Sequence, residues 1–555
     1  MDRILTGRGM KSIDTYTIQK VGIPSMVLME RAALEVSRFI QDKITETQKV
    51  LCICGTGNNG ADAVAVARQL VCFGYMAEVV IVGDETKSSE EFNYQKNIAV
   101  SCNVKFLDTV TSIEDNAYHN LYMGLKEEYA VVVDGIFGIG LSRNVEGTIK
   151  KLIEDINHIR KQRNAENSLF EVVAVDIPSG LNSSTGAIMG AAIVADYTIT
   201  FGTKKAGMCL YMGKDICGKV IVCDIGFPEV AFQNALDKMD YYNVIEKEDL
   251  IKCLHRNSHS NKGTYGKALI IAGSKGMYGA AYLAARASFS IGSGLVRIVT
   301  HKENRELIYK MLPEAMLDTY ETIEDIDNIA LDKSIKWADS VLIGPGIGKD
   351  DIASELVRRT INIAKEQDKY LIIDADGLNI ISEDSDLKES YYDKVIITPH
   401  IGEASRLMNV DSEKIASDIV NVALDYSDKY GINVVLKDST SVILGIESFD
   451  NKCNNRAYVN TTGNAGMAIA GSGDVLAGII AGVMAGGLNK ELLGDNITKA
   501  IALAVYIHGL AGDLAAKEKG QTSMLARRYR NLQPHHHQGD CTWHETNLPR
   551  DRDCS

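Results

Sequence analysis

One stretch of the sequence decides the fold of its first half: Lys49-Val50-Leu51-Cys52-Ile53-Cys54-Gly55-Thr56-Gly57-Asn58-Asn59-Gly60-Ala61-Asp62. It joins an apolar run to a glycine-rich turn, and a helical pattern follows from Ala61 to Phe73. A strand, a glycine-rich turn and a helix in this order are typical of a parallel α/β sheet. The next apolar run, Ala77–Val82, fits the neighbouring strand of such a sheet.

Further apolar runs continue this series up to residue 226: Ala130–Asp134, Glu171–Asp176, Asp196–Phe201 and Lys219–Cys223. Polar residues stand at the ends of these predicted strands, among them Asn58, Asp134 and Asp176. Ligands of parallel sheets bind beyond the carboxyl ends of the strands. We therefore expect a Rossmann-like three-layer sandwich with a site at that edge of its sheet.

The second half follows a charged segment, Phe227–Asn261, which shows no clear strand and in which we place the linker between domains. A new α/β series then begins: Lys267–Ala272, Leu295–Thr300, Ser340–Ile343, Tyr370–Asp374, Val395–Thr398 and Asn433–Leu436. The two series share no repeat. A chain of 555 residues is also too long for one ordinary core. We expect two unlike α/β domains, residues 1–235 and residues 236–526.

Composition narrows the class of protein. A formal net charge of −14 argues against a nucleic-acid surface, which is usually basic. The 11 cysteines show no metal-ligand spacing, so we expect free thiols in a reducing compartment. The start, Met1-Asp2-Arg3, has no signal-peptide pattern, and we see no apolar run of the roughly 18 residues that a membrane span needs. We expect a cytoplasmic protein that binds neither nucleic acid nor membranes.

The last segment, Arg527–Ser555, differs from the rest of the chain. It contains no lysine, it holds the run His535-His536-His537, and its only aliphatic residues are Leu532 and Leu548. Such a segment cannot bury enough apolar surface to offset its ordering entropy. We expect it to lie outside the fold, and the abrupt change at Arg527 suggests that it is not native sequence.

The glycine-rich turn of the first half allows more than one interpretation. Gly55, Gly57 and Gly60 match the dinucleotide fingerprint G-x-G-x-x-G, and Glu78 lies near the end of the next predicted strand, where it would hold a ribose. The adjacent amides of Asn58 and Asn59 do not belong to that fingerprint. Nor does the carboxylate of Asp62, which we place in the first turn of the helix, where it could simply favour the helix dipole.

Three motifs at strand ends are more specific: Asn58-Asn59-Gly60-Ala61-Asp62, Asp134-Gly135-Ile136-Phe137-Gly138-Ile139-Gly140-Leu141 and Asp176-Ile177-Pro178-Ser179-Gly180-Leu181. With Leu28-Met29-Glu30-Arg31-Ala32, Gly202-Thr203-Lys204-Lys205 and Asp224-Ile225-Gly226, they closely resemble the NAD(P)H-hydrate epimerase family. The family usually has glycine where this chain has Ala61 and Ala63.

This resemblance implies a potassium ion held by Asn59, Asp134 and Ser179, which offer hard oxygen ligands. It implies substrate contacts from Asn58, Asn59, Gly60, Asp62, Gly138, Ile139, Gly140, Leu141, Ser142, Arg143, Asn144 and Asp176. Epimerisation at C6 of a hydrated nicotinamide requires the hydroxyl to leave or the ring to open. A carboxylate near C6 could shuttle the proton and stabilise the cationic ring, and we assign this catalytic role to Asp176. Asp62 is a second candidate, or it only orders the loop.

The second half has its own signature: Asn464-Ala465-Gly466-Met467-Ala468-Ile469-Ala470-Gly471-Ser472-Gly473-Asp474-Val475-Leu476-Ala477-Gly478. Small residues let the backbone approach a ligand, and the start of the apolar helix offers free amides to a phosphate. Asp474 could cap this helix, but a carboxylate beside a phosphate site is better explained by a chemical role. The signature resembles ribokinase-like enzymes, in which the matching Asp is the base that activates a hydroxyl for phosphoryl transfer.

Further motifs narrow the resemblance to the ADP-dependent NAD(P)H-hydrate dehydratase family: Lys262-Gly263-Thr264-Tyr265-Gly266, Gly273-Ser274, Gly279-Ala280-Ala281, Gly344-Pro345-Gly346-Ile347-Gly348 and Thr398-Pro399-His400-Ile401-Gly402-Glu403. They imply a ribokinase-like three-layer sandwich in which Ala280, Gly346, His400 and Asp474 contact the substrate. A lone His400 could also be purely structural. Lys437, Asp438, Ser439, Thr440, Ser441 and Gly473 would bind the nucleotide, although the family usually has Gly at 438 and Thr at 441.

The implied chemistry resembles that of a kinase. The C6 hydroxyl of the hydrate attacks a phosphate of ADP while Asp474 takes its proton, and the phosphate then leaves as the double bond forms. Magnesium would neutralise the transferring group. Dehydratase relatives often assemble, so we expect a homo-oligomer. The sequence leaves open the choice between the hydrates of NADH and NADPH.

Two other hypotheses stay open at this point. The chain could be a small-molecule kinase fused to a nucleotide-binding dehydrogenase domain, but this leaves Asn58, Asn59 and Ser179 unexplained. Alternatively, the first domain could be a binding scaffold, as in relatives that act in mRNA decapping. A scaffold has no need for Asn59, Asp134 and Ser179, all of which are present.

Overall fold

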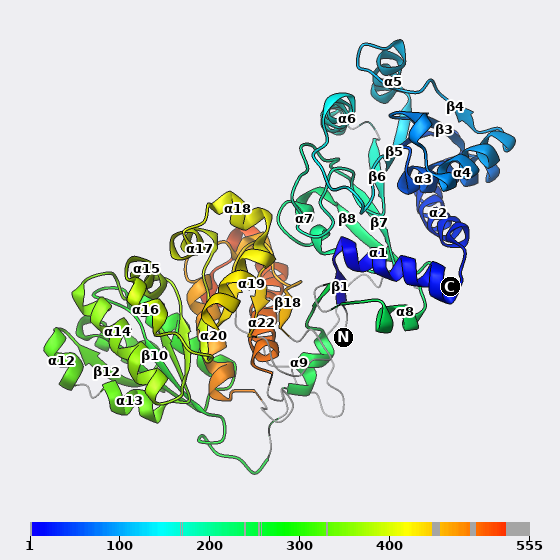
Figure 1. Cartoon of the computed structure of the whole chain (residues 1–555). Coiled ribbons are helices and arrows are strands. Elements are labelled where there is room, and N and C mark those ends of the chain that lie inside the picture. The colour runs from blue at the N-terminus through cyan, green and yellow to red at the C-terminus, as the bar shows by residue number, and fades with distance from the viewer. Residues whose placement is uncertain are drawn as a thin grey trace. The chain divides into compact units, whose positions relative to one another are not determined.

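The computed structural model divides into two compact α/β units (Figure 1), the first mainly Met1–Val244 and the second mainly from Ile245 onward. The structure describes residues 3–528 except 167, 169, 238–239, 254–255, 257, 329–330, 447–455 and 489–495. The predicted tail therefore lies outside the described residues from residue 529 onward. Of the tail, Arg527 and Arg528 complete a 3₁₀ turn, Ala526–Arg528, and Arg286 donates a hydrogen bond of 3.0 Å to the carbonyl of Arg527.

The first unit contains a seven-stranded parallel sheet in the order β4-β3-β2-β5-β6-β7-β8. Its strands are β2 (Lys49–Cys54), β3 (Met76–Ile81), β4 (Lys105–Phe106), β5 (Tyr129–Gly135), β6 (Glu171–Val175), β7 (Tyr197–Phe201) and β8 (Lys219–Cys223). Strands β1 (Arg3–Leu5) and β9 (Tyr241–Asn243), which do not belong to this parallel sheet, pair with each other in antiparallel fashion. The strand order reverses direction between β2 and β5, which is where ligands of such sheets bind.

Helices cover both faces of this sheet. Cys52 and Cys54 lie in one buried cluster with residues of α2, α3 and α4, while Leu51 and Ile53 lie in another with residues of α5 and α6. The side chains of β2 thus alternate between two apolar layers, as the pleat of a strand requires. The helices are α1 (Gly7–Tyr16), α2 (Ser25–Gln41), α3 (Asn58–Cys72), α4 (Glu90–Ser101), α5 (Asn116–Glu127), α6 (Gly147–Ala165), α7 (Gly213–Ile216) and α8 (Glu229–Asn234). The prediction of a three-layer sandwich is confirmed.

The sheet of the second unit runs in the order β18-β17-β16-β15-β14-β13-β10-β11-β12. It is parallel from β16 to β12, and β17 and β18 are antiparallel. Its strands are β10 (Lys267–Ile271), β11 (Leu295–His301), β12 (Met316–Tyr320), β13 (Ser340–Ile343), β14 (Tyr370–Ile373), β15 (Val395–Ile397), β16 (Asn433–Leu436), β17 (Val442–Leu444) and β18 (Ala457–Val459). Here the order reverses between β10 and β13.

Both faces of this second sheet are also covered. Ala268 and Ile270 belong to a core cluster with α10, α20 and α22, and Leu269 and Ile271, which point the other way, are completely buried. The helices after Val244 are α9 (Lys247–Cys253), α10 (Tyr278–Ser290), α11 (Arg305–Met311), α12 (Ile323–Asn328), α13 (Leu331–Trp337), α14 (Asp351–Glu366), α15 (Asp376–Glu383), α16 (Ser385–Glu389), α17 (Ile401–Met408), α18 (Ser412–Ser417), α19 (Ile419–Tyr430), α20 (Ser472–Ala485) and α22 (Ile497–Lys519).

Three details correct the sequence-based description. Within Phe227–Asn261, where no strand stood out, β9 pairs with β1 through backbone hydrogen bonds rather than through an apolar pattern. Helix α22 is long and apolar enough to cross a membrane by composition, and 72% of its apolar window is buried inside the structure, as in a core helix. The short strands β4, β12, β17 and β18 were not predicted. As expected, the cysteines among the described residues are free thiols.

Candidate active sites

The three residues predicted to hold a cation meet where the first sheet reverses its strand order. Asp134 is the last residue but one of β5, Asn59 is the second residue of α3, which follows β2, and Ser179 lies after β6. The hydroxyl of Ser179 donates to Asp134 Oδ1 at 2.5 Å and contacts the carbonyl of Phe137 at 3.2 Å. Asn59 Nδ2 donates to that same carbonyl at 3.0 Å. The structure therefore brings together a carboxylate, a hydroxyl, a side-chain amide and a backbone carbonyl.

Asp134 is the charged member of this group. Its side chain is completely enclosed and accepts hydrogen bonds from the backbone amides of Ser179, at 2.7 Å, and Ile136, at 3.2 Å. Burial raises the pKa of Asp134 to about 6, against the opposing effect of these donors. A buried carboxylate surrounded by neutral oxygen groups is the kind of ligand set that suits a hard cation.

Glycines allow the backbone to close around this group. A Cβ atom on Gly60 would lie 1.8 Å from the carbonyl oxygen of Gly55, so only glycine fits. A Cβ on Gly138 would lie 3.3 Å from the side chain of Asn59, which places the predicted loop Gly138–Asn144 beside the amides. Gly138, Ile139 and Leu141 are half-buried, whereas Gly140, Ser142, Arg143 and Asn144 are exposed, as is Asn58. These exposed groups remain accessible to a ligand.

Asp176 lies at the end of β6 in a left-handed conformation with φ of 63°, which is uncommon for a residue other than glycine. Its Oδ1 accepts from the ammonium of Lys205 at 2.5 Å, the hydroxyl of Thr200 at 3.1 Å and the amide of Phe201 at 3.3 Å. Lys205 was recognised only as part of a motif and given no role. A second lysine beside it, Lys204, offers no sequence signal to tell the two apart.

Asp62 lies one full turn into α3, which begins at Asn58, and not in the first turn as predicted. Its distance from the helix start weakens the interpretation that it only complements the helix dipole. Burial, together with the charges of Asp176 and Asp14, raises the pKa of Asp62 well above its ordinary value. Burial and the charges of Asp176 and Glu91 likewise raise the pKa of Asp14, a neighbour that no sequence motif indicated.

Glu78 does not lie where the dinucleotide interpretation requires it. It occupies the third position of β3 rather than the end of that strand, and it is buried. Its carboxylate accepts hydrogen bonds from Lys105 at 2.8 Å and from the hydroxyl of Tyr129 at 2.6 Å. Both of its oxygens therefore serve the sheet, which counts against a ribose-binding role.

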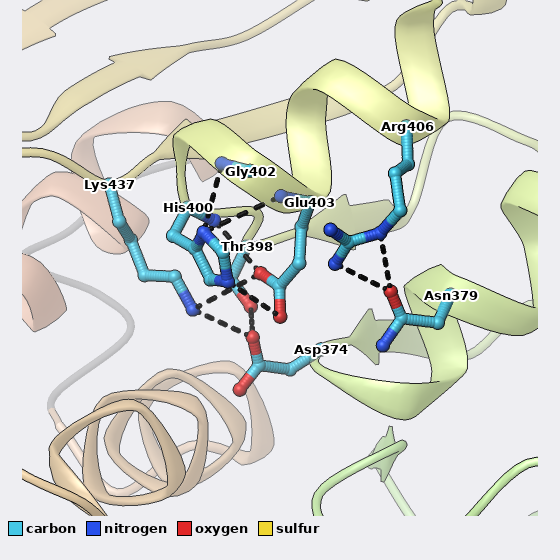
Figure 2. Close-up of polar contacts among 8 residues, drawn as sticks. All are labelled: Asp374, Asn379, Thr398, His400, Gly402, Glu403, Arg406 and Lys437. Carbon is cyan, nitrogen blue, oxygen red and sulfur yellow. Dashed lines mark hydrogen bonds and ion pairs between the residues drawn. The ribbon is translucent and has the colours of Figure 1, made fainter. Parts of the chain in front are cut away.

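The second site centres on a buried carboxylate at the end of β14 and a half-buried lysine at the end of β16, with β15 between these strands (Figure 2). Asp374 follows β14, and its Oδ1 accepts from Lys437 Nζ at 2.9 Å and from the hydroxyl of Thr398 at 2.7 Å. The ammonium also lies 4.0 Å from Glu403. Burial lowers the pKa of Lys437, but the charges of Asp374 and Glu403 raise it by more, so the pKa is above its ordinary value. Asp374 and Glu403 were not predicted as site residues, although Asp374 ends an apolar run in the same way as Asp134.

Asp474 lies in the first turn of α20, beside this pair. The N-cap position of α20 is Gly471, and no side chain makes a capping hydrogen bond there. The interpretation of Asp474 as a helix cap is therefore not supported. A Cβ on Gly473 would lie 3.6 Å from Lys437 Nζ and 3.8 Å from Asp374 Oδ2. Burial and the charge of Asp374 raise the pKa of Asp474 to about 6. A carboxyl with that pKa changes its protonation close to neutral pH.

The predicted substrate contacts of this unit fall into two places. Gly346, with φ of +61°, faces α10, since a Cβ there would lie 3.0 Å from the Cβ of Ala280. His400 pairs with Lys437 through a backbone bridge, which links it to the second site. Figure 2 shows that its Nδ1 also caps α17, accepting from the amide of Gly402 at 3.0 Å. His400 thus has a structural role, while most of its ring remains exposed.

The predicted nucleotide loop connects β16 to β17. Lys437 stands at its start, Asp438 and Ser439 are exposed, Thr440 is buried and Ser441 is half-buried. The backbone carbonyl of Ser441 accepts a hydrogen bond of 2.9 Å from Asn460. Within this loop, Lys437 is the residue that the contacts described above place beside Asp374 and Gly473.

Comparison with known proteins accounts for both units. The family model described as YjeF-related protein N-terminus matches residues 25–207, and the model described as NAD(P)H-hydrate dehydratase matches residues 268–534, which extends past Ala526. A bifunctional NAD(P)H-hydrate repair enzyme of Thermofilum pendens is 34% identical over 540 residues, covering 95% of this chain and 94% of that relative. The chain belongs to this family of bifunctional NAD(P)H-hydrate repair enzymes.

Other members of the repair family cover the chain almost as fully. The enzyme of Moorella thermoacetica is 31% identical over 94% of both chains, and that of Escherichia coli is 30% identical over 91% of this chain and 88% of its own. Among solved structures, an ADP/ATP-dependent NAD(P)H-hydrate dehydratase from Bacillus subtilis, co-crystallised with ATP and Mg²⁺, is 27% identical. It covers 52% of this chain and 95% of its own, with a TM-score of 0.42.

Proposed function

We propose that this chain repairs hydrated NAD(P)H in two steps. The first unit interconverts the C6 epimers of the hydrate, and the second dehydrates the (S) epimer to NAD(P)H at the expense of ADP, which yields AMP and phosphate. The main support is the repair-family match, which spans both units. In each unit, polar groups also gather at the carboxyl ends of parallel strands.

Epimerisation needs an acid and an anion near C6. The raised pKa of Asp62 means that a proton is available there, and it passes to the C6 hydroxyl as the C6–O bond breaks and water leaves. The ring nitrogen then shares its lone pair with C6, and the anion of Asp176 stabilises the resulting positive charge. Water adds to the opposite face of C6 and returns a proton to Asp62. Asp176 and Asp62 thus share the role that the sequence assigned mainly to Asp176.

A potassium ion fits the group at the end of β5. The oxygen atoms of Asp134, Ser179 and Asn59 and the carbonyl of Phe137 would hold it, and hydrogen bonds already bring these groups together. When bound, the ion would neutralise the buried carboxylate and attract the phosphates of the substrate. The backbone of Gly138–Asn144 would wrap those phosphates, as successive amides do in anion-binding loops.

Dehydration needs a base and a phosphate site. Asp474 takes the proton of the C6 hydroxyl while that oxygen attacks the terminal phosphate of ADP. The phosphate then leaves C6 and a proton leaves the neighbouring carbon as the double bond forms. Lys437 and the loop Asp438–Ser441 contact the nucleotide, while Ala280, Gly346 and His400 contact the hydrate. Magnesium would be carried mainly by the phosphates, and Asp374 Oδ2 accepts no hydrogen bond from the described residues and is free to reach it.

We extend the proposal to the surroundings of the protein. We propose that it acts in the cytoplasm as a homo-oligomer and binds neither nucleic acid nor membranes. The net charge of −14 supports the absence of a nucleic-acid surface, and the burial of α22 supports its role as a core helix. Size measurement in solution and binding assays with duplex DNA and lipid vesicles test these points.

The decisive experiment separates the two steps. Purified (R)-NADHX and (S)-NADHX are incubated with the chain, with and without ADP, and the absorbance of NADH is followed. We expect NADH from both epimers, in each case only with ADP, and exchange of the epimers without ADP. If (R)-NADHX reacts in neither assay, the epimerase assignment of the first unit is refuted. If (S)-NADHX with ADP gives no NADH, the dehydratase assignment of the second unit is refuted.

A further inference from the structure

Lys205 is completely buried, with none of its side chain exposed. An ammonium group has three N–H donors, and burying it is costly unless all are used. Here the three go to Asp176 Oδ1 at 2.5 Å, Thr200 Oγ1 at 2.8 Å and the carbonyl of Phe201 at 3.0 Å. The lysine is therefore fixed in place and has no donor left for a ligand.

The same contacts divide the two oxygens of Asp176. Oδ1 receives hydrogen bonds from Lys205, from the hydroxyl of Thr200 at 3.1 Å and from the amide of Phe201 at 3.3 Å. Oδ2 accepts no hydrogen bond from the part of the chain that the structure describes. The side chain is 14% exposed, so this second oxygen is reachable. One oxygen is thus held and the other is open.

The backbone supports the same orientation. The left-handed conformation of Asp176 turns the chain at the end of β6, and its amide donates to the carbonyl of Ile199 on β7 at 2.8 Å. Strands β6 and β7 are direct neighbours, and Thr200 and Phe201 lie on β7. The carboxylate is therefore anchored to the adjacent strand from both its backbone and its Oδ1.

We propose that Lys205 is a positioning residue of the epimerase site, which holds Oδ1 of Asp176 so that Oδ2 faces the nicotinamide ring as a fixed anion. This inference rests on the proposed function of the first unit. Lys205 touches no substrate and acts through Asp176 alone. A fixed anion stabilises the ring cation without reorganising during the reaction, which is the source of such catalysis.

A purely structural role would predict something different. Buried ion pairs are seldom better for stability than apolar residues of similar size, so stability alone gives little reason for a lysine at this position. If Lys205 only supported the fold, its loss would lower the unfolding temperature of the first unit and reduce epimerisation only as far as that unit unfolds. If it positions Asp176, its loss lowers kcat for epimerisation while the first unit stays folded.

The test is Lys205→Met, with Lys204→Met as the matched control because Lys204 is the adjacent, exposed lysine. Conversion of (R)-NADHX is measured with an excess of separate dehydratase, and the thermal unfolding profile of the variant, compared with that of the wild type, reports that both units have folded. We expect kcat for epimerisation to fall about 10²-fold in Lys205→Met with KM nearly unchanged. Lys204→Met should equal the wild type. An unchanged kcat in Lys205→Met overturns the inference.

A double mutant shows whether the effect passes through Asp176. If Lys205 acts through that carboxylate, Lys205→Met adds less than about a threefold loss to Asp176→Asn. Full additivity of the two losses contradicts the positioning role. Wild-type chain that fails to convert (R)-NADHX refutes the proposed function instead, so the two failures can be told apart.

Thr200→Val decides the matter if Lys205→Met does not fold. It keeps the shape of the side chain and removes only the hydroxyl that joins Lys205 to Asp176. We expect about a tenfold lower kcat for epimerisation, the typical effect of losing one hydrogen bond to a charged group. A kcat equal to that of the wild type overturns the inference.

Discussion

The two units place a lysine against an aspartate in nearly the same way, but they leave the lysine with different freedom. In both, Oδ1 of an aspartate at the end of a parallel strand accepts from a lysine and from a threonine: Lys205 and Thr200 on Asp176, Lys437 and Thr398 on Asp374. Lys205 is fully buried, whereas the side chain of Lys437 is 18% exposed.

Their remaining donors explain the difference. Lys205 uses all three N–H groups inside the protein, whereas Lys437 makes one hydrogen bond within the described residues and a looser ion pair with Glu403 at 4.0 Å. An ammonium with open donors beside the start of α20 can turn to a phosphate, while a saturated one can only hold its neighbour. The first pair is therefore suited to position a working carboxylate, and the second to bind a ligand.

The largest effect should come from removing the carboxylate that we propose as the catalytic residue of each unit. Asp474→Asn should lower NADH formation from (S)-NADHX by about 10²–10⁴-fold because it removes the base. Epimer exchange should stay intact in this variant, and Asp176→Asn should show the reverse pattern. NADH absorbance and chromatographic separation of the epimers measure the two activities. Undiminished dehydration in Asp474→Asn would remove this residue from the mechanism.

The next effect tests the freedom of Lys437. Lys437→Met should raise the KM for ADP by about 10–100-fold, since it removes charged hydrogen bonds to a phosphate. Lys205→Met should leave that KM unchanged and serves as the matched control, because it removes a lysine that is paired with an aspartate in the same way in the other unit. Initial rates of NADH formation at varied ADP concentration give both values. Equal KM values for Lys437→Met and the wild type would show that Lys437, like Lys205, makes contacts only within the protein and does not bind ADP.

A smaller effect concerns the potassium ion that we propose for the first unit. Ser179→Ala removes a hydroxyl that lies 2.5 Å from Asp134. We therefore expect the potassium concentration that gives half-maximal epimerisation to rise about 10-fold. Titration of the epimerase rate with KCl at constant ionic strength measures this, with choline chloride as the balancing salt. Epimerisation that proceeds equally well without potassium would show that Asp134, Ser179 and Asn59 hold no functional ion.

The pH dependence should differ in direction between the units. Asp474 must be ionised to act as a base, and its pKa is raised to about 6, so dehydration should fall about tenfold per pH unit below that value. Asp62 must be protonated to act as an acid, so epimerisation should fall as the pH rises through its raised pKa. Rates of each step between pH 5 and about 9 test this, with the (S) epimer isolating dehydration. Parallel profiles would contradict the assigned protonation states.

Most of the fold could be predicted because long apolar strands carry a local signal. Lys49–Cys54, Lys219–Cys223 and Ser340–Ile343 form strands with the predicted bounds. The strands that the sequence did not predict include short or half-buried ones. Strand β4 has two residues, and in β12 Asp318 and Thr319 interrupt the apolar pattern. Pairing with a neighbouring strand, rather than composition, makes such segments into strands.

The proximity of Asp134 and Ser179 was also predictable, since both stand in recognisable motifs at strand ends. The residues that surround the carboxylates of Asp62 and Asp176 could not be predicted. Asp14 comes from α1, far from any motif, and reaches Asp62 and Asp176 only through the folded unit. The prediction that Glu78 lies near the end of its strand was wrong, because Glu78 lies near the start of both the predicted strand, Ala77–Val82, and β3.

The sequence by itself determined which kinds of group stand at the strand ends, because apolar runs, glycine turns and carboxylates are local patterns. Only the tertiary structure decided that Lys205 rather than Lys204 turns inward, and that Oδ2 rather than Oδ1 of Asp176 stays open. The reason is that a lysine can be buried only where acceptors from other segments use its donors. For Lys205 those acceptors come from Asp176 and from β7, and strand order brings them together.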